Sequence, residues 1–232
     1  MLLLVPAADE GCLVRNDWIC GEYVTSRADD ILAATAQHVA LASVSLVISV
    51  LVAFPLALLA RRSAWAKGFV LGASTVVYTI PSLALFALLL PITGITPTTV
   101  VVGLVLYSLT ILVRALVEGL ESVPADAVEA ARGMGMGPRR VFWRVQLPLA
   151  QPTAFAGLRV AAVSTVALVT VGFVVGYGGL GNLIDDGLDT FFRPQVLTAT
   201  VLCVLLAVLF DLAVLMVERL ATPWRRGRQG GS

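Results

Sequence analysis

Long hydrophobic runs separated by short polar segments dominate the sequence. The runs suited to crossing a membrane occupy residues 38–60, 68–91, 98–117, 153–175 and 196–217. A helix that crosses the hydrocarbon core of a bilayer needs about 20 mostly apolar residues, which each run supplies. Pro81 interrupts the second run and leaves room for a broken helix there. The pattern predicts about five membrane-spanning helices.

The composition favours a membrane protein over a soluble one. The chain of 232 residues is 58% hydrophobic and 13% charged, and its mean hydropathy is +0.92. Soluble domains carry about 25% charged and about 45–50% apolar residues, and one domain of this size has too little interior to bury the excess. We therefore predict an all-α fold, a polytopic transmembrane helix bundle without a separate soluble domain.

The basic residues indicate the orientation of the bundle. Five spans place the termini on opposite sides, and cytoplasmic segments of membrane proteins carry an excess of Lys and Arg. With the C-terminus inside, the inner segments hold Arg61, Arg62, Lys67, Arg132, Arg139, Arg140, Arg144, Arg219, Arg225, Arg226 and Arg228. The outer segments then hold Arg15, Arg27 and Arg193 and most of the acidic residues. We predict an exported N-terminal tail at 1–30, a membrane domain at 31–222 and a basic cytoplasmic tail at 223–232.

The cysteines leave one question open. Three cysteines and one histidine exclude most metal-cluster sites, and we expect no metal site. Cys12 and Cys20 lie in the predicted outer tail, where an oxidising compartment would permit a disulfide. Because spacing alone does not set the geometry, a disulfide and two unrelated thiols are both compatible with the sequence.

The segment 123–148, between the third and fourth runs, predicts two short cytoplasmic helices. Pro124 suits the first turn of a helix, and Asp126 and Glu129 place negative charge near its N-terminus, where the helix dipole favours it. The glycines that can end this helix and form a tight corner are Gly133, Gly135 and Gly137.

The second helix of this segment can begin at Pro138. Val141, Phe142 and Val145 would form its apolar stripe, and we expect Pro148 to end it. One interpretation is an ordinary loop on the membrane surface, with arginines touching lipid phosphates. The other is a docking element for a second protein.

The segment resembles the EAA motif of ABC importer permeases. That motif reads Glu-Ala-Ala, three residues, Gly, nine residues, Ile or a similar residue, one residue, Leu-Pro. The matching residues are Glu129, Ala130, Ala131, Gly135, Val145, Leu147 and Pro148, with Val145 in place of Ile. The resemblance implies coupling helices that sit in a groove of an ATP-hydrolysing subunit. Phe142 and Trp143 can add contact area, and Glu129 has two open roles, pairing with a partner arginine or capping its own helix.

Weaker motifs extend the likeness to osmoprotectant permeases, which import glycine betaine, choline, carnitine or proline betaine. They occupy residues 78–85, 90–91, 178–181, 210–212 and 218–220. The resemblance implies a permease subunit in the bacterial plasma (inner) membrane that forms the path for the solute. Its partners would be two cytoplasmic ATP-binding subunits, an extracytoplasmic substrate-binding protein and a second permease. We expect that permease to be a paralogue rather than an identical copy.

Several residues are candidates for the translocation path. Pro81 can kink its span, Thr79 and Ser82 can bond the freed carbonyls, and Tyr78 can meet a quaternary ammonium group through its ring. The Gly-rich turn adds Gly179 and Gly181. Asp211 is ionisable within a span, and we expect a structural ion pair with Arg114 or Arg159 rather than a substrate contact.

The sequence lacks the signatures of catalysis. It contains no Gly-x-x-x-x-Gly-Lys-Ser/Thr segment and no clustered nucleophile and base. We expect a non-catalytic subunit with no cofactor of its own, with ATP-Mg bound by the partner ATPase, and with no nucleic-acid partner. The alternatives are a permease for another small solute, such as methionine or a thiol-containing betaine, and a channel or membrane enzyme.

Overall fold

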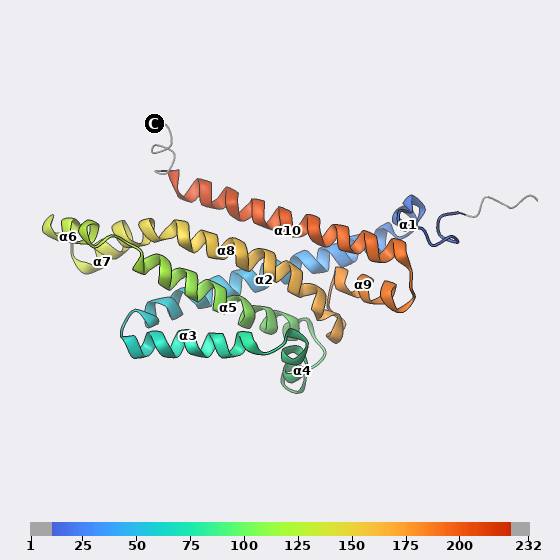
Figure 1. The fold of residues 1–232 in the computed structure, drawn as a ribbon, viewed down its shortest axis with the longest axis horizontal. Helices are drawn as coiled ribbons and strands as arrows, with labels where there is room; N and C mark the ends of the chain where they lie inside the picture. The colour runs from blue at the N-terminus through green and yellow to red at the C-terminus, as the bar shows by residue number, and fades with distance from the viewer. Residues whose placement is uncertain (1–10, 224–232) are drawn as a thin grey trace, which may run out of the picture.

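The structure, a computed structural model, describes residues 11–223. Every regular element in that range is a helix, and the long helices form one elongated bundle (Figure 1). In chain order, the helices of the described residues are α1 (Gly21–Ser26), α2 (Ala28–Ala60), α3 (Ala64–Thr79), α4 (Ser82–Thr93), α5 (Pro97–Glu121), α6 (Ala125–Gly133), α7 (Pro138–Val141), the π-helix η1 (Phe142–Gln146), α8 (Leu147–Val169), the 3-10 helix η2 (Thr170–Val175), α9 (Leu180–Asp189) and α10 (Arg193–Ala221). The predicted all-α bundle is confirmed. Parts of the two predicted tails, at 1–10 and 224–232, lie outside the described residues.

The described helices contain four or five candidate spans. Four are long and apolar enough to cross a membrane alone: Ala28–Ala60, Pro97–Glu121, Pro138–Val175 and Arg193–Ala221. The helices α3 and α4 pass the same test together but are bent by 100° at the break between them. Counted as one crossing they give the five spans that the sequence predicts, with the break at Pro81. The first span begins at Ala28, well before the expected residue 38.

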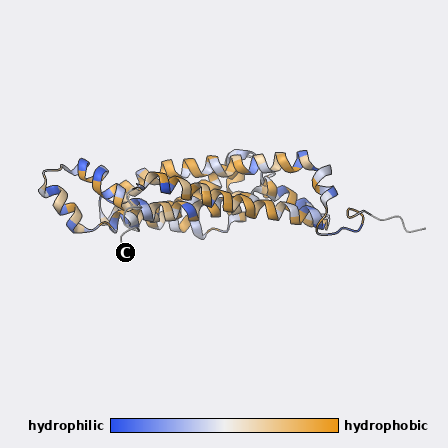
Figure 2. Cartoon of the chain, turned by 90° about the horizontal axis from the view of Figure 1, so that it is seen from above, coloured by the Kyte–Doolittle hydropathy of each residue, from blue (hydrophilic) through white to orange (hydrophobic). Residues whose placement is uncertain are grey.

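The two ends of the bundle differ from its middle. Hydrophobic residues line the length of the long helices, and hydrophilic ones gather toward the ends (Figure 2). Helices α6 and α7 project beyond one end, whereas α1 and α9 lie at the other (Figure 1). The last span, α10, runs from the α9 end toward the α6–α7 end, so the two ends of the described chain lie at opposite ends of the bundle.

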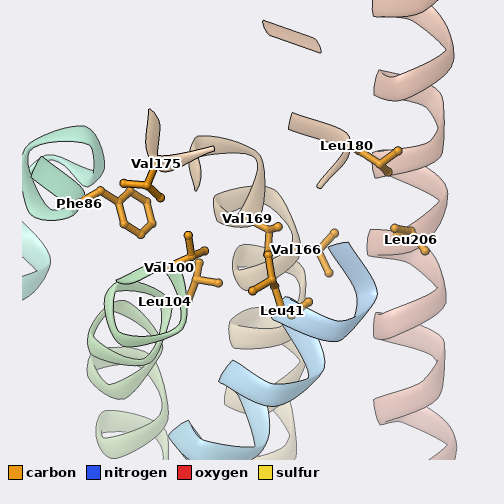
Figure 3. Close-up of a cluster of buried hydrophobic side chains, with 10 residues drawn as sticks. Leu41, Phe86, Val100, Leu104, Val166, Val169, Val175, Leu180 and Leu206 are labelled. Carbon is orange, nitrogen blue, oxygen red and sulfur yellow. The ribbon is translucent and has the colours of Figure 1, made fainter. Parts of the chain in front are cut away.

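Two hydrophobic clusters hold the bundle together. Near α9, side chains from seven elements meet, as labelled in Figure 3: Leu41, Phe86, Val100, Leu104, Val166, Val169, Val175, Leu180 and Leu206. Nearer α6, the second cluster is rich in small residues, including Ala53, Ala57, Ala60 and Ala161. Small residues let membrane helices approach closely and gain dispersion contacts. A Cβ added to Gly157 of α8 would lie 2.1 Å from the Cβ of Ala115 of α5, which shows how close these two helices are.

The question of the N-terminal cysteines is settled by the geometry. Cys12 and Cys20 form a disulfide that closes a short loop before α1. The Asn16 side chain in that loop bridges the turn before α10, because its Nδ2 donates to the Phe191 carbonyl and its Oδ1 accepts from the Arg193 N–H, both at 2.8 Å. The described part of the predicted tail is therefore folded onto the bundle.

Candidate functional site

The first helix of the predicted coupling segment is α6. It follows Pro124 and carries Asp126 in its first turn, as the sequence predicts. Glu129 and Ala130 are exposed, whereas Ala131 is 1% exposed and faces the neighbouring helix. Two roles were considered for Glu129, pairing with a partner arginine and capping its own helix. The structure shows no side-chain cap by Glu129 on α6. The helix thus packs through one small residue and leaves its acidic side free.

Gly135 ends α6 through its backbone conformation. The Gly135 N–H donates to the Arg132 carbonyl at 2.9 Å, and the Met136 N–H donates to the Ala131 carbonyl at 3.1 Å. These two bonds form a Schellman cap, which requires a left-handed residue at the first position after the helix. Gly135 has a φ of +80°, and nothing lies within 4 Å of the place a Cβ would occupy. The motif glycine is therefore needed for its conformation rather than for lack of space.

The second helix departs from the prediction. It begins at Pro138, as expected, but Pro148 does not end it, because α7, η1 and α8 follow one another without a break. Proline has no N–H, and its ring collides with the carbonyl four residues earlier in a regular α-helix. The chain accommodates Pro148 with a wide π-turn just before it, in which the Leu147 N–H donates to the Phe142 carbonyl. The coupling segment thus continues directly into the fourth span.

The remaining motif residues are partly covered. Phe142, Leu147 and Pro148 are half-buried, and Trp143 is exposed by 51%. The Phe142 and Trp143 rings meet edge to face, with centroids 5.2 Å apart. The segment therefore leaves α6, the Gly135 corner and about half of the Trp143 side chain exposed.

The break between α3 and α4 gathers four of the predicted path residues. Tyr78, Thr79, Pro81 and Ser82 line a cavity of about 430 Å³ together with Tyr107, Ser108 and Ser164. The carbonyls at the break are bonded by the Thr79 hydroxyl, which donates to Val76, and by the Tyr107 hydroxyl, which donates to Ile80. The Tyr78 and Tyr107 rings lie edge to face at 5.6 Å. The sequence did not single out the pairing of Tyr107 with the break, since the two are far apart in the chain.

This cavity continues along α5 and α8. A second cavity of about 580 Å³ shares Tyr78 and Ile111 with the first and includes Arg114 and Glu118. A third of about 360 Å³ shares Ser164 with the first and is lined by Arg159 and Asp211. We call these three cavities together the groove.

Asp211 forms the ion pair expected of it, with Arg159. The Arg159 Nε and Nη2 donate to the two carboxylate oxygens of Asp211, both at 2.7 Å. The two side chains keep 38% and 28% of their surface exposed, and they face the groove. Ionisable residues in a span face protein or water rather than lipid. This side of the bundle is therefore unsuited to direct contact with lipid.

Gly179 and Gly181 lie elsewhere. A Cβ on Gly179 would lie 2.7 Å from the Cβ of His38, and a Cβ on Gly181 would lie 2.1 Å from the Thr170 carbonyl oxygen. Both glycines are buried where α9 packs against α2 and η2. The structure does not bring them together with Tyr78–Ser82, and it gives them a packing role.

Comparison with known families agrees with this arrangement. Residues 38–226 match the family described as the binding-protein-dependent transport system inner membrane component. The chain belongs to this family. Its members are the permease subunits of ABC transporters, which are not catalytic themselves.

Several curated permeases resemble this one. The choline transport system permease protein OpuBB of Bacillus subtilis is 29% identical over 87% of this chain and 93% of its own length. The osmoprotectant import permease protein OsmW of Salmonella typhimurium is 32% identical over 87% of this chain and 96% of its own. The ergothioneine transport permease/ergothioneine binding protein EgtU of Helicobacter pylori is 39% identical over 63% of this permease and 26% of its own length.

The fold also matches a solved structure. A chain of the MetNI methionine ABC transporter, in an inward-facing form, superposes with a TM-score of 0.76 and covers 85% of this permease and 98% of its own length. Its sequence is 22% identical, so this likeness bears on the fold alone.

Proposed function

We propose that this permease imports osmoprotectants such as glycine betaine, carnitine, choline or proline betaine, driven by ATP hydrolysis on partner subunits. Support comes from relatives named for choline and for osmoprotectant import that align over nearly their whole lengths. The segment 123–148 docks the ATPase through Glu129, Ala130 and the Gly135 corner. Its exposure at one end of the bundle, beyond the spans, is the observation that carries this part of the proposal.

The assembly we propose has two ATP-binding subunits, two permeases and an extracytoplasmic binding protein. The groove supports a second permease, because its partly exposed ion pair needs a protein or water neighbour. We propose a paralogue rather than an identical copy, and ATP-Mg bound by the partner ATPase.

The orientation we propose puts the N-terminus outside. The excess of arginines at the α6–α7 end supports it. The Cys12–Cys20 disulfide supports it independently, since disulfides persist in oxidising compartments outside the cytoplasm.

The path we propose follows the groove past the break between α3 and α4. Its first cavity has aromatic and hydroxyl groups and no charged side chain among its lining residues. A quaternary ammonium group is attracted to the face of a tyrosine ring, by about 0.5–2 kcal/mol. Tyr78, half-exposed, is placed to offer such a face, and Thr79, Pro81 and Ser82 shape the turn beside it.

A second candidate cargo is ergothioneine, a betaine that carries a thiol. The 39% identity with EgtU over 63% of this chain favours it. It differs from glycine betaine by a sulfur-bearing imidazole ring that a methylene group joins to the ammonium-bearing carbon, so the two cargoes are separable by competition.

Competition for uptake tests the proposal. Cells that carry the complete transporter should take up labelled glycine betaine or choline, and unlabelled carnitine and proline betaine should compete. Competition by ergothioneine alone would move the assignment to the second cargo, and no competition by any of them would overturn the osmoprotectant assignment. Within the same assay, Tyr78→Ala should raise the apparent KM about threefold to thirtyfold, whereas Tyr78→Phe, which keeps the ring, should leave it near wild type.

A further inference from the structure

The π-turn Phe142–Gln146 lies at the junction between the coupling segment and the fourth span. Along the chain, α7 is joined to α8 through this turn, because the helix is continuous from Pro138 to Val175. A π-turn is a less stable geometry than the α-helix, and such turns often mark functional sites. The contacts that hold this turn in place therefore determine how a movement of α6 is transmitted to α8.

Two side chains from the end of α2 contact the π-turn. The Arg61 Nη2 donates to the Gln146 Oε1 at 3.0 Å, and the Arg61 guanidinium lies 5.3 Å from the centroid of the Phe142 ring. One arginine thus touches the first and last residues of the turn. Phe54, two helical turns earlier in α2, has its ring 6.2 Å from that of Trp143.

The end of α2 is a firm base for these contacts. Ala53, Ala57 and Ala60 are at most 2% exposed and belong to the second hydrophobic cluster. The Arg61 backbone N–H donates to the Ala57 carbonyl at 3.3 Å, which ties the arginine to the last turn of the helix. A load on the π-turn is therefore shared between α8, to which it is covalently joined, and α2, to which Arg61 holds it.

We infer that Arg61 is a positioning residue for coupling. It clamps the π-turn to α2, so that movement imposed on α6 and α7 shifts the inner ends of α2 and α8 together. Without the clamp, the turn would absorb part of the movement by bending. The inference rests on the proposed function, since it assumes that a partner ATPase moves the coupling segment.

A first experiment tests the clamp in the full-length permease alone. Hydrogen exchange of the amides at 142–147 is compared in wild type, Arg61→Ala and Arg62→Ala. Within residues 11–223, the Arg62 side chain makes no hydrogen bond, ion pair or ring contact with the turn, and it serves as the matched control. Loss of one hydrogen bond and one cation–π contact should speed exchange about tenfold in Arg61→Ala. If these amides exchange as slowly in Arg61→Ala as in Arg62→Ala, the clamp is overturned, whichever solute the permease transports.

A second experiment tests its role in coupling. The complete transporter is reconstituted in proteoliposomes, and the amount of substrate imported per ATP hydrolysed is measured. Arg61→Ala should lower this ratio about fivefold while ATP hydrolysis continues, in line with typical coupling energies between sites. Arg61→Lys, which keeps the charge but lacks the flat guanidinium, should fall between Arg61→Ala and wild type.

The outcomes separate this inference from the proposed function. A wild-type transporter that imports substrate while Arg61→Ala shows an unchanged ratio overturns the role of Arg61 and leaves the proposed function intact. A wild-type assembly that hydrolyses ATP without any import overturns the proposed function, and the inference with it. A simple folding defect in Arg61→Ala would lower ATP hydrolysis and import equally, which also contradicts a positioning role.

Discussion

The two ends of the bundle are built in opposite ways. The disulfide end, residues 11–31 and 176–193, is tied by a covalent bond, by the two hydrogen bonds of Asn16 and by the Tyr23–Phe192 ring contact at 5.4 Å. The coupling end, residues 123–148, has two fully buried side chains, those of Ala131 and Val141. The disulfide end is fastened by a covalent bond, whereas the coupling end, beyond its contacts with the end of α2, leaves α6 exposed. If the disulfide end is rigid, movement at the coupling end can tilt the spans as a unit without separating them from one another.

Replacement of a closely packed glycine at the disulfide end should give the largest loss of stability. In Gly181→Val, the new Cβ would lie 2.1 Å from the Thr170 carbonyl oxygen and 2.5 Å from its Cα, and backbone atoms cannot move aside. We expect a loss of more than about 3 kcal/mol of stability and little monodisperse protein in size-exclusion chromatography. The control is Gly72→Ala in α3, where nothing lies within 4 Å of the added carbon. Normal yield of Gly181→Val would contradict the packing described for α9.

Removal of the disulfide should have the next largest effect. For a loop of this length the chain-entropy model gives about 2–3 kcal/mol. We expect the double variant Cys12→Ser, Cys20→Ser to exchange amide hydrogens faster at 11–31 and 190–193, with the coupling end unchanged. Cys203→Ser is the control, because Cys203 is a free thiol within α10. Equal exchange in wild type and the double variant would mean that the disulfide does not fasten this end.

Gly135→Val should lower the stability less than the preceding changes do. It should impair coupling while leaving folding intact. A β-branched residue at a φ of +80° strains the cap by about 1–2 kcal/mol, while no neighbour obstructs the side chain. We expect normal membrane insertion and reduced substrate-stimulated ATP hydrolysis and uptake. Gly137→Ala is the matched control, since Gly137 has an ordinary φ of −66° and open space around it. Uptake and stimulated hydrolysis at wild-type levels in Gly135→Val would defeat the role given to this corner.

The smallest effect concerns the acidic helix α9. Burial, with the nearby charges of Asp189 and Asp186, raises the pKa of Asp185 above its ordinary value. A raised pKa means that the folded state binds the proton more tightly, so this group stabilises the fold at low pH and opposes it once ionised. Asp185→Asn should therefore raise Tm slightly at pH 7, and the difference should vanish as the pH falls toward the ordinary value of 3.8. A lower Tm for Asp185→Asn at pH 7 would contradict this sign.

The sequence predicted the spans and the starts of helices α6 and α7 better than it predicted how α7 joins the fourth span. The spans and their orientation follow from local hydropathy and from the placement of arginines, and both can be taken directly from the sequence. Pro148 was expected to stop a helix because proline ends most helices in water. The structure keeps the helix with a π-turn, and residues of this turn contact Arg61 and Phe54 from a distant part of the chain.

The site was predicted in parts. Residue type predicted that Asp211 would form an ion pair, but it left Arg114 and Arg159 open as partners, and the structure selects Arg159. The cavity at the α3–α4 break needs Tyr107 and Ser164, whose contribution depends on how α5 and α8 cross. Gly179 and Gly181 looked like path residues because of their family motif. Only the close approach of His38 and Thr170 reveals their packing role.

Contact between the coupling end and an ATPase is central to the proposed function. A photoreactive phenylalanine analogue placed at exposed Ala130, and separately at Leu188, which is 57% exposed at the disulfide end, tests it directly. Illumination of native membranes should join the Ala130 probe to a protein whose mass spectrum contains a Gly-x-x-x-x-Gly-Lys-Ser/Thr peptide, and the Leu188 probe should not yield it. No such product from Ala130, or the same product from Leu188, would contradict the central claim.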